Sequence, residues 1–147
     1  MNVRSSLCLP SAVSEPKIDG PINRNRERAL VALLVLIGLT GLVGGIFLAA
    51  RPDGSLLHAK PSALVGTPFR DWRVPGILLA ALVGGGLLGA GLWLAAHLPY
   101  RREIGLVAAV GLFAFEVVQF LIIGFQGLQV VIGVAALVMA TLAWGLR

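Results

Sequence analysis

The sequence predicts an all-α fold, an integral membrane four-helix bundle, and three observations support this prediction. Hydrophobic residues make up 57% of the 147-residue chain and charged residues only 13%, whereas about 25% of a soluble domain is charged. The mean hydropathy is +0.90. Four apolar stretches follow one another along the chain, each about 20 residues long, which is the length that crosses a hydrocarbon core of about 30 Å.

Each stretch predicts one membrane helix, because in lipid a lone segment satisfies its backbone only as a helix. The helices are expected at residues 29–50, 74–96, 104–123 and 128–146. The first is longer than the apolar part of a signal peptide, so we interpret it as a retained helix. The third and fourth are joined only by residues 124–127, which predicts an antiparallel hairpin. Together with the loop at 51–73 they form the domain 29–147.

Residues 1–28 mix Ser, Pro, Asn and charged residues without helical or strand periodicity. We expect them to form a disordered tail that precedes the membrane domain.

The positions of the basic residues predict the orientation, since Lys and Arg gather on the cytoplasmic side of membrane helices. The tail, the loop after the second helix and the C-terminus hold most of them, and the loop at 51–73 holds the rest. We therefore expect both termini in the cytoplasm, the segment 51–73 outside, and the protein in the inner (plasma) membrane of a bacterial cell.

Composition also argues against several classes of function. The formal net charge is +5, but the basic residues flank apolar runs and do not form the single basic face of a nucleic-acid binder. His58 and His97 are expected on opposite sides of the membrane, and no nucleophile, base and acid can be assembled on one side. We expect no enzyme activity, no metal, no cofactor and no nucleic-acid partner.

Small residues at four-residue spacing predict where helices pack, because they let backbones come close in lipid. The expected packing residues are Gly41 and Gly45 in the first helix and Ala81, Gly85 and Gly89 in the second. The same pattern also serves homodimers, so one of these faces is alternatively an interface between two copies.

Glu116 and Gln119 interrupt the apolar third helix and form its candidate polar site. They share a face with Gly105, Ala109 and Leu112, at alternating spacings of four and three residues, so the pair is expected to point into the bundle. A carboxylate in the membrane costs about 2.5–3.5 kcal/mol on insertion scales unless it is paired, protonated or open to water. The structural interpretation pairs Glu116 with Arg70 or Arg73, and the functional one makes Glu116 and Gln119 a proton or cation site.

The segment before the second helix, "GTPFRDWRVPG", resembles that of an uncharacterised family of small bacterial four-helix membrane proteins with an outer segment of the type GSPFxDYxxPG. The matching positions are Gly66, Pro68, Phe69, Asp71, Trp72, Pro75 and Gly76, with Trp72 in place of tyrosine. The resemblance covers residues 29–147. It implies the four-helix architecture and supplies no activity.

Two functions follow as hypotheses. The first is an accessory or structural subunit that acts through contacts of its helices and outer loop with a membrane protein, with another copy of itself or with membrane lipid. The alternative is a small proton- or cation-coupled transporter that uses Glu116.

Overall fold

A computed structural model describes residues 21–57, 59, 61–125 and 127–146. The first long helix is α1 (Pro21–Ala50), and two short 3-10 turns follow, η1 (Ser55–Leu57) and η2 (Pro61–Leu64). The second membrane helix runs without a break through α2 (Arg73–Leu78), the π-helical segment η3 (Leu79–Gly85) and α3 (Gly86–Ala95). A short loop leads to α4 (Arg101–Ile123), and α5 (Gly127–Trp144) ends the described chain.

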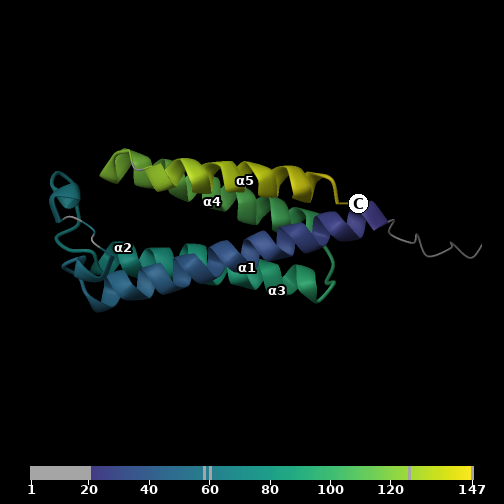
Figure 1. Cartoon of the computed structure of the whole chain (residues 1–147), viewed down its shortest axis with the longest axis horizontal. Coiled ribbons are helices and arrows are strands. Elements are labelled where there is room, and N and C mark those ends of the chain that lie inside the picture. The colour runs from purple at the N-terminus through teal and green to yellow at the C-terminus, as the bar shows by residue number, and fades with distance from the viewer. Residues whose placement is uncertain (1–20, 58, 60, 126, 147) are drawn as a thin grey trace, which may run out of the picture.

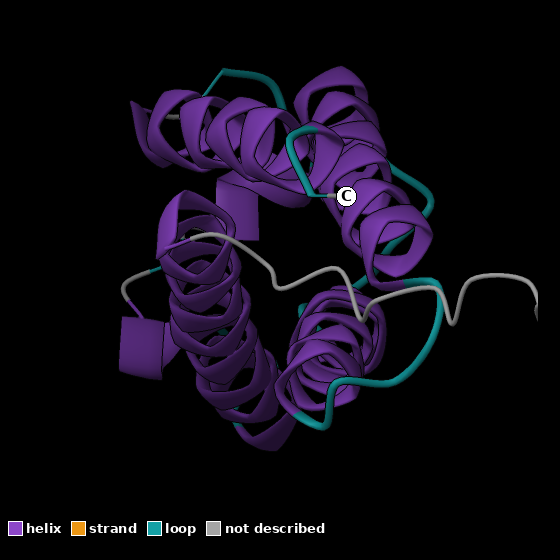
Figure 2. Ribbon diagram, turned by 90° about the vertical axis from the view of Figure 1, so that its right-hand side faces the viewer, coloured by secondary structure: helices purple, strands orange, loops and turns teal. Residues whose placement is uncertain are grey.

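The predicted all-α fold is confirmed, since the described residues contain no strand. Four helical spans are long and apolar enough to cross a membrane, at Ile22–Ala50, Arg73–Ala95, Arg101–Ile123 and Gly127–Trp144. They run side by side along one axis (Figure 1) and surround a common centre when viewed along that axis (Figure 2). The chain is thus a multi-pass membrane protein. Which end of the bundle faces the cytoplasm stays a prediction.

The two ends of the bundle differ. The start of α1 and the end of α5 lie together at one end, which we call the terminal end (Figure 1). The loop after α1 and the turn between α4 and α5 lie at the other, which we call the loop end. The predicted inner side corresponds to the terminal end, and the predicted outer side corresponds to the loop end.

The first helix begins earlier than the sequence predicted. It starts at Pro21, so residues 21–28 are helical and do not belong to a disordered tail; the remaining residues of that predicted tail lie outside the described chain. Proline is favoured at the first position of a helix, because its missing N–H has no intrahelical acceptor there. The extension is also held by tertiary contact, since Glu27 is buried at the terminal end.

The four spans pack as two pairs. The hairpin α4–α5 is one pair, as predicted, and α1 with the second membrane helix is the other. The pairs join through α1 against α5 and α3 against α4. At this junction lie the largest fully buried side chains, those of Leu30, Leu34, Leu94 and Met139.

Glycines form the seam between α1 and the second membrane helix, and Gly41 and Gly45 take part in it as predicted. A Cβ added at Gly41 would lie 2.9 Å from the Val83 side chain, and one added at Gly45 would lie 2.5 Å from the carbonyl oxygen of Gly76. On the opposite helix a Cβ at Gly84 would lie 2.7 Å from the Leu42 backbone. At these positions the backbones of α1 and the second membrane helix are so close that only glycine, with hydrogen as its side chain, fits.

The prediction for the second helix was wrong by one helical position. Ala81, Gly85 and Gly89 are exposed, and the residues that meet α1 are Gly76, Ala80 and Gly84. Both sets have four-residue spacing, so periodicity alone did not separate them. The Gly45–Gly76 contact at the loop end selects the set that packs, and it leaves the other set facing outward.

Candidate functional site

Glu116 lies on the buried face of α4, as its spacing predicted. Gly105, Ala109, Leu112 and Glu116 are the buried residues of this helix, and Glu116 is only 8% exposed. Gln119, one turn further on, is half-buried. Counted from Arg101, Glu116 lies about 22 Å along the helix, closer to the loop end than to the terminal end.

The structural interpretation, an ion pair of Glu116 with Arg70 or Arg73, is not borne out among the described residues. Arg70 and Arg73 are exposed, and within the described residues no salt bridge joins either of them to Glu116. Arg70 lies in the loop before α2, and Arg73 is the first residue of α2, which packs on α1. The Glu116 Oε2 atom is buried without a hydrogen-bond partner in the described part of the chain.

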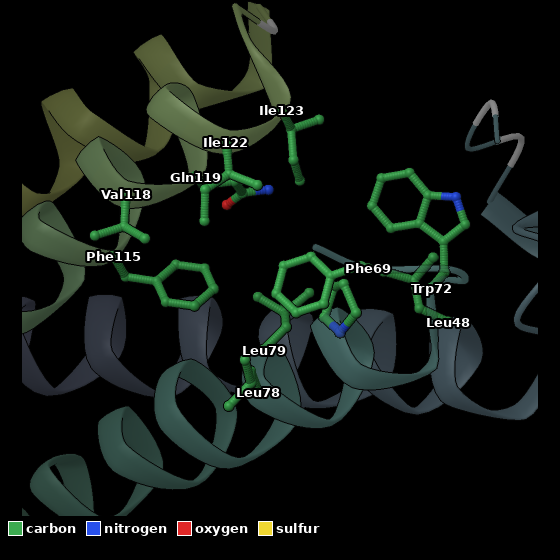
Figure 3. Close-up of a pocket in the computed structure, with 11 residues that line it drawn as sticks. Leu48, Phe69, Trp72, Leu78, Leu79, Phe115, Val118, Gln119, Ile122 and Ile123 are labelled. Atoms are coloured by element: carbon green, nitrogen blue, oxygen red, sulfur yellow. The ribbon is translucent and has the colours of Figure 1, made fainter. Parts of the chain in front are cut away.

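Gln119 lines a small cavity at the loop end. The cavity has a volume of about 90 Å³ and lies between α4, the second membrane helix and the loop that follows α1. Gln119 lines it together with Phe115, Ile122 and Ile123 of α4, and Phe69 of the loop also lines it (Figure 3). Glu116 does not line this cavity. The two polar residues therefore share a helix face but not a binding cavity.

The first residues of the outer-loop motif form the turns that lead into α2. Gly66 has a φ of +87°, a conformation that glycine adopts without strain. The Asp71 carboxylate accepts a hydrogen bond from the backbone N–H of Arg73 at 3.0 Å, which starts α2. Pro68 lies exposed between these two turns.

The second half of the motif anchors the loop on the helices. Trp72 is 5% exposed, and its backbone N–H donates to the carbonyl oxygen of Pro52 at 3.0 Å. Its ring packs in a loop-end cluster with Leu48 and Leu64, and Phe69 packs against that cluster. Pro75, in the first turn of α2, lines the cavity beside Gln119. The motif thus shapes both the helix start and one wall of the cavity.

A polar cluster at the terminal end was not predicted. Nη1 of Arg101 donates to both carboxylate oxygens of Glu27, at 2.9 and 3.0 Å, and Nδ1 of His97 lies 3.3 Å from Glu27 Oε1. Glu27 is 6% exposed. The cluster joins α1 to the start of α4 across the junction of the two helix pairs. Sequence reasoning missed it because Glu27 was assigned to the tail.

The loop around this cluster is held in an unusual conformation. His97 and Tyr100 have φ values of +52° and +62°, which side-chain-bearing residues adopt only when surrounding contacts hold them. Trp93 Nε1 donates to the carbonyl oxygen of Pro99 at 2.8 Å. Also at the terminal end, the guanidinium of Arg102 in α4 lies 4.5 Å from the centre of the ring of Trp144, the last residue of α5. This is a cation–π contact.

Among the described residues, no group of three or more His, Cys, Asp and Glu side chains is placed to hold a metal ion. No protein-family model, curated protein or solved structure matches the chain. The resemblance to the four-helix family with the outer-loop motif therefore stays a prediction.

Proposed function

We propose that the protein is an accessory subunit that packs against a helix of another membrane protein. The observation that carries this proposal is the outward-facing set Ala81, Gly85 and Gly89. These residues are exposed, and within the described chain a Cβ added at Gly89 would meet no atom within 4 Å. Small residues four apart let a second helix approach closely in lipid, where van der Waals contact drives helix association.

The loop end adds a second surface for such a partner. Leu56, Val65 and Phe125 are large apolar side chains that are at least half exposed there, and Val65 is 82% exposed. The motif residues Asp71 and Trp72 serve the loop's own structure, so the exposed apolar side chains are the better candidates for contact with a partner.

The test is purification from the native membrane in mild detergent, followed by mass spectrometry of the proteins that accompany the tagged chain. We expect a stoichiometric partner with the natural sequence and its loss with Gly85→Leu, which adds a side chain to the outward face. Gly133→Leu is the matched control, because Gly133 of α5 is also a membrane glycine whose added Cβ would meet no atom within 4 Å in the described chain. Purification of the chain alone, or only with copies of itself, would contradict the proposal.

A proton- or cation-coupled transporter is the second candidate, and the burial of Glu116 without a partner for Oε2 favours it. An acid inside a membrane helix is a common component of ion pathways. The test is flux of protons and of Na⁺ or K⁺ into liposomes that contain the purified protein. Ion flux through the natural protein that is lost in a correctly folded Glu116→Gln variant would support transport. Absence of flux through the natural protein would leave the accessory proposal as the stronger one.

A further inference from the structure

Glu116 is the one ionisable side chain inside the four apolar runs of the sequence. Residues 29–50, 74–96, 104–123 and 128–146 contain no other Asp, Glu, His, Cys, Tyr, Lys or Arg. In the described chain the buried polar or charged residues are Glu116 and Glu27, which are exposed to nearly the same small extent. Because the two glutamates are matched in burial, a comparison of their surroundings shows what is particular to Glu116.

The two buried carboxyl groups differ in whether a cation reaches them. Arg101 donates to both carboxylate oxygens of Glu27, at 2.9 and 3.0 Å. The Oε2 atom of Glu116 has no hydrogen-bond partner in the described chain, and no salt bridge joins Glu116 to another described residue. Burial of an ionised carboxylate without a cation is strongly unfavourable, and such a group becomes neutral instead. Arg101 thus compensates a charge on Glu27, whereas no described residue compensates one on Glu116.

The shape of the described chain gives Glu116 little contact with water. Glu116 lines neither the cavity beside Gln119 nor the apolar groove between α4 and the second membrane helix. Its neighbours along the chain, residues 112–115 and 117–118, are all apolar. A carboxyl group persists in a membrane helix when it is paired, open to water or protonated. Protonation is the condition that the surroundings of Glu116 allow.

A proton suits this site better than a metal ion does. Metal cations such as Ca²⁺ take several oxygen ligands, and ion-coupled transporters supply part of them as the free backbone carbonyls of unwound helices. The α4 helix is unbroken from Arg101 to Ile123, so the carbonyl oxygens around Glu116 accept intrahelical hydrogen bonds. In the part of the chain that the structure describes, Glu116 belongs to no group of three or more His, Cys, Asp and Glu side chains that could hold a metal ion. A single carboxyl group, by contrast, is sufficient to hold a proton.

We propose that Glu116 is a proton-binding site, whose carboxyl group holds a proton in the membrane and takes it in preference to Na⁺ or K⁺. One proton from water adds to the carboxylate, and neither a metal ion nor another reactant takes part. The inference names the ion for the transporter candidate, and it rests on that candidate for any role in coupled transport. Proton binding itself requires only that Glu116 is buried without a cation.

The experiment is infrared difference spectroscopy of the full chain at about pH 7, where carboxyl groups in water are ionised. The protein is reconstituted in vesicles of an ether-linked phosphatidylcholine, which has no ester carbonyl to mask the signal. The natural protein should show the carbonyl stretching band of a protonated carboxyl group, and Glu116→Gln should lose it. Glu103→Gln is the matched control and should keep the band, because Glu103 is an exposed glutamate of the same helix. Absence of the band from the natural protein, or its retention in Glu116→Gln, would overturn the proposal.

The salt in the buffer tests the preference for a proton. The band should be unchanged when NaCl or KCl replaces choline chloride at the same concentration, because the ionic strength stays constant and only the metal ion changes. Loss of the band in NaCl or KCl would show that a metal ion displaces the proton. That result would overturn the proposed preference and identify a metal-cation site.

A second measurement uses the natural sequence alone, in case Glu116→Gln does not fold. Dicyclohexylcarbodiimide dissolves in lipid and adds to a protonated carboxyl group, which forms an N-acylurea without loss of atoms. Peptide mass spectrometry should find Glu116 modified at least about tenfold more than Glu103, because only about one carboxyl group in several hundred is protonated in water at about pH 7. Equal modification of the two glutamates would overturn the proposal.

The infrared band and the flux assay separate this inference from the transporter candidate. The band without any flux would contradict transport and leave the proton site in place. Flux of Na⁺ or K⁺ that depends on Glu116, in a protein without the band, would overturn the proton site and leave ion transport in place.

Discussion

Gly45 of α1 and Gly76 of α2 lie in reciprocal contact where the two helices cross. A Cβ added at Gly45 would lie 2.5 Å from the carbonyl oxygen of Gly76, and a Cβ added at Gly76 would lie 2.7 Å from the carbonyl oxygen of Gly45. Neither helix can accept a side chain at this point without moving apart. The crossing fixes the start of the second membrane helix and, with it, the outer-loop motif.

The first prediction concerns this crossing. Gly76→Leu should lower the free energy of unfolding by at least about 1–3 kcal/mol, the usual cost of overpacking a well-packed core. Unfolding of the purified protein in mixed micelles with increasing dodecyl sulfate measures the change. Gly133→Leu, at a glycine with open space around it, should change stability much less. Equal effects of the two variants would show that the crossing is not tight in the membrane.

The second prediction concerns the ion pair between Glu27 and Arg101. Arg101→Met should destabilise the protein by about 3–5 kcal/mol, because it leaves a buried carboxylate without its cation. The same unfolding assay applies, with Arg24→Met as the control at an exposed arginine of α1. If Arg101→Met and Arg24→Met change the free energy of unfolding by similar amounts, the Glu27–Arg101 ion pair does not hold the two helix pairs together.

The third prediction compares the two buried glutamates. Replacement of Glu116 by Leu should stabilise the protein by about 1–3 kcal/mol, since Oε2 is buried without a hydrogen-bond partner in the described chain and the variant removes that desolvation cost. Glu27→Leu should have the opposite sign, because Glu27 accepts two hydrogen bonds from Arg101. Loss of stability in Glu116→Leu would mean that the carboxyl group has a partner in the membrane.

The fourth prediction concerns pH and the loop after α1. The backbone N–H and the hydroxyl group of Ser55 donate to Asp53 Oδ1, and these hydrogen bonds lower the pKa of Asp53 from its usual value of 3.8. A lowered pKa means that the ionised form stabilises the turn; this contribution is present above the unfolded-state pKa and is lost as pH falls through the folded-state value. The Ser55 amide resonance should therefore titrate with a midpoint below 3.8, and this titration should vanish in Asp53→Asn. A midpoint at or above 3.8 would contradict the hydrogen-bonded turn.

The sequence by itself determined the helical class, the four spans and the buried face of α4. Long apolar runs leave only helices as stable structures in lipid, and helical periodicity placed Glu116 among small and apolar residues of one face. The seam residues Gly41 and Gly45 were predictable for the same reason, because small residues mark close approach of helices.

Only the tertiary structure decided which of two neighbouring small-residue faces packs, whether Glu116 meets an arginine, and where α1 begins. Gly76 and Gly85 belong to two sets with the same spacing, and the contact with Gly45 selects between them. Glu27 is buried in α1, where Arg101 and His97, far along the chain, reach its carboxylate. These outcomes depend on contacts between distant segments, and local periodicity contains no information about which segment arrives at a given face.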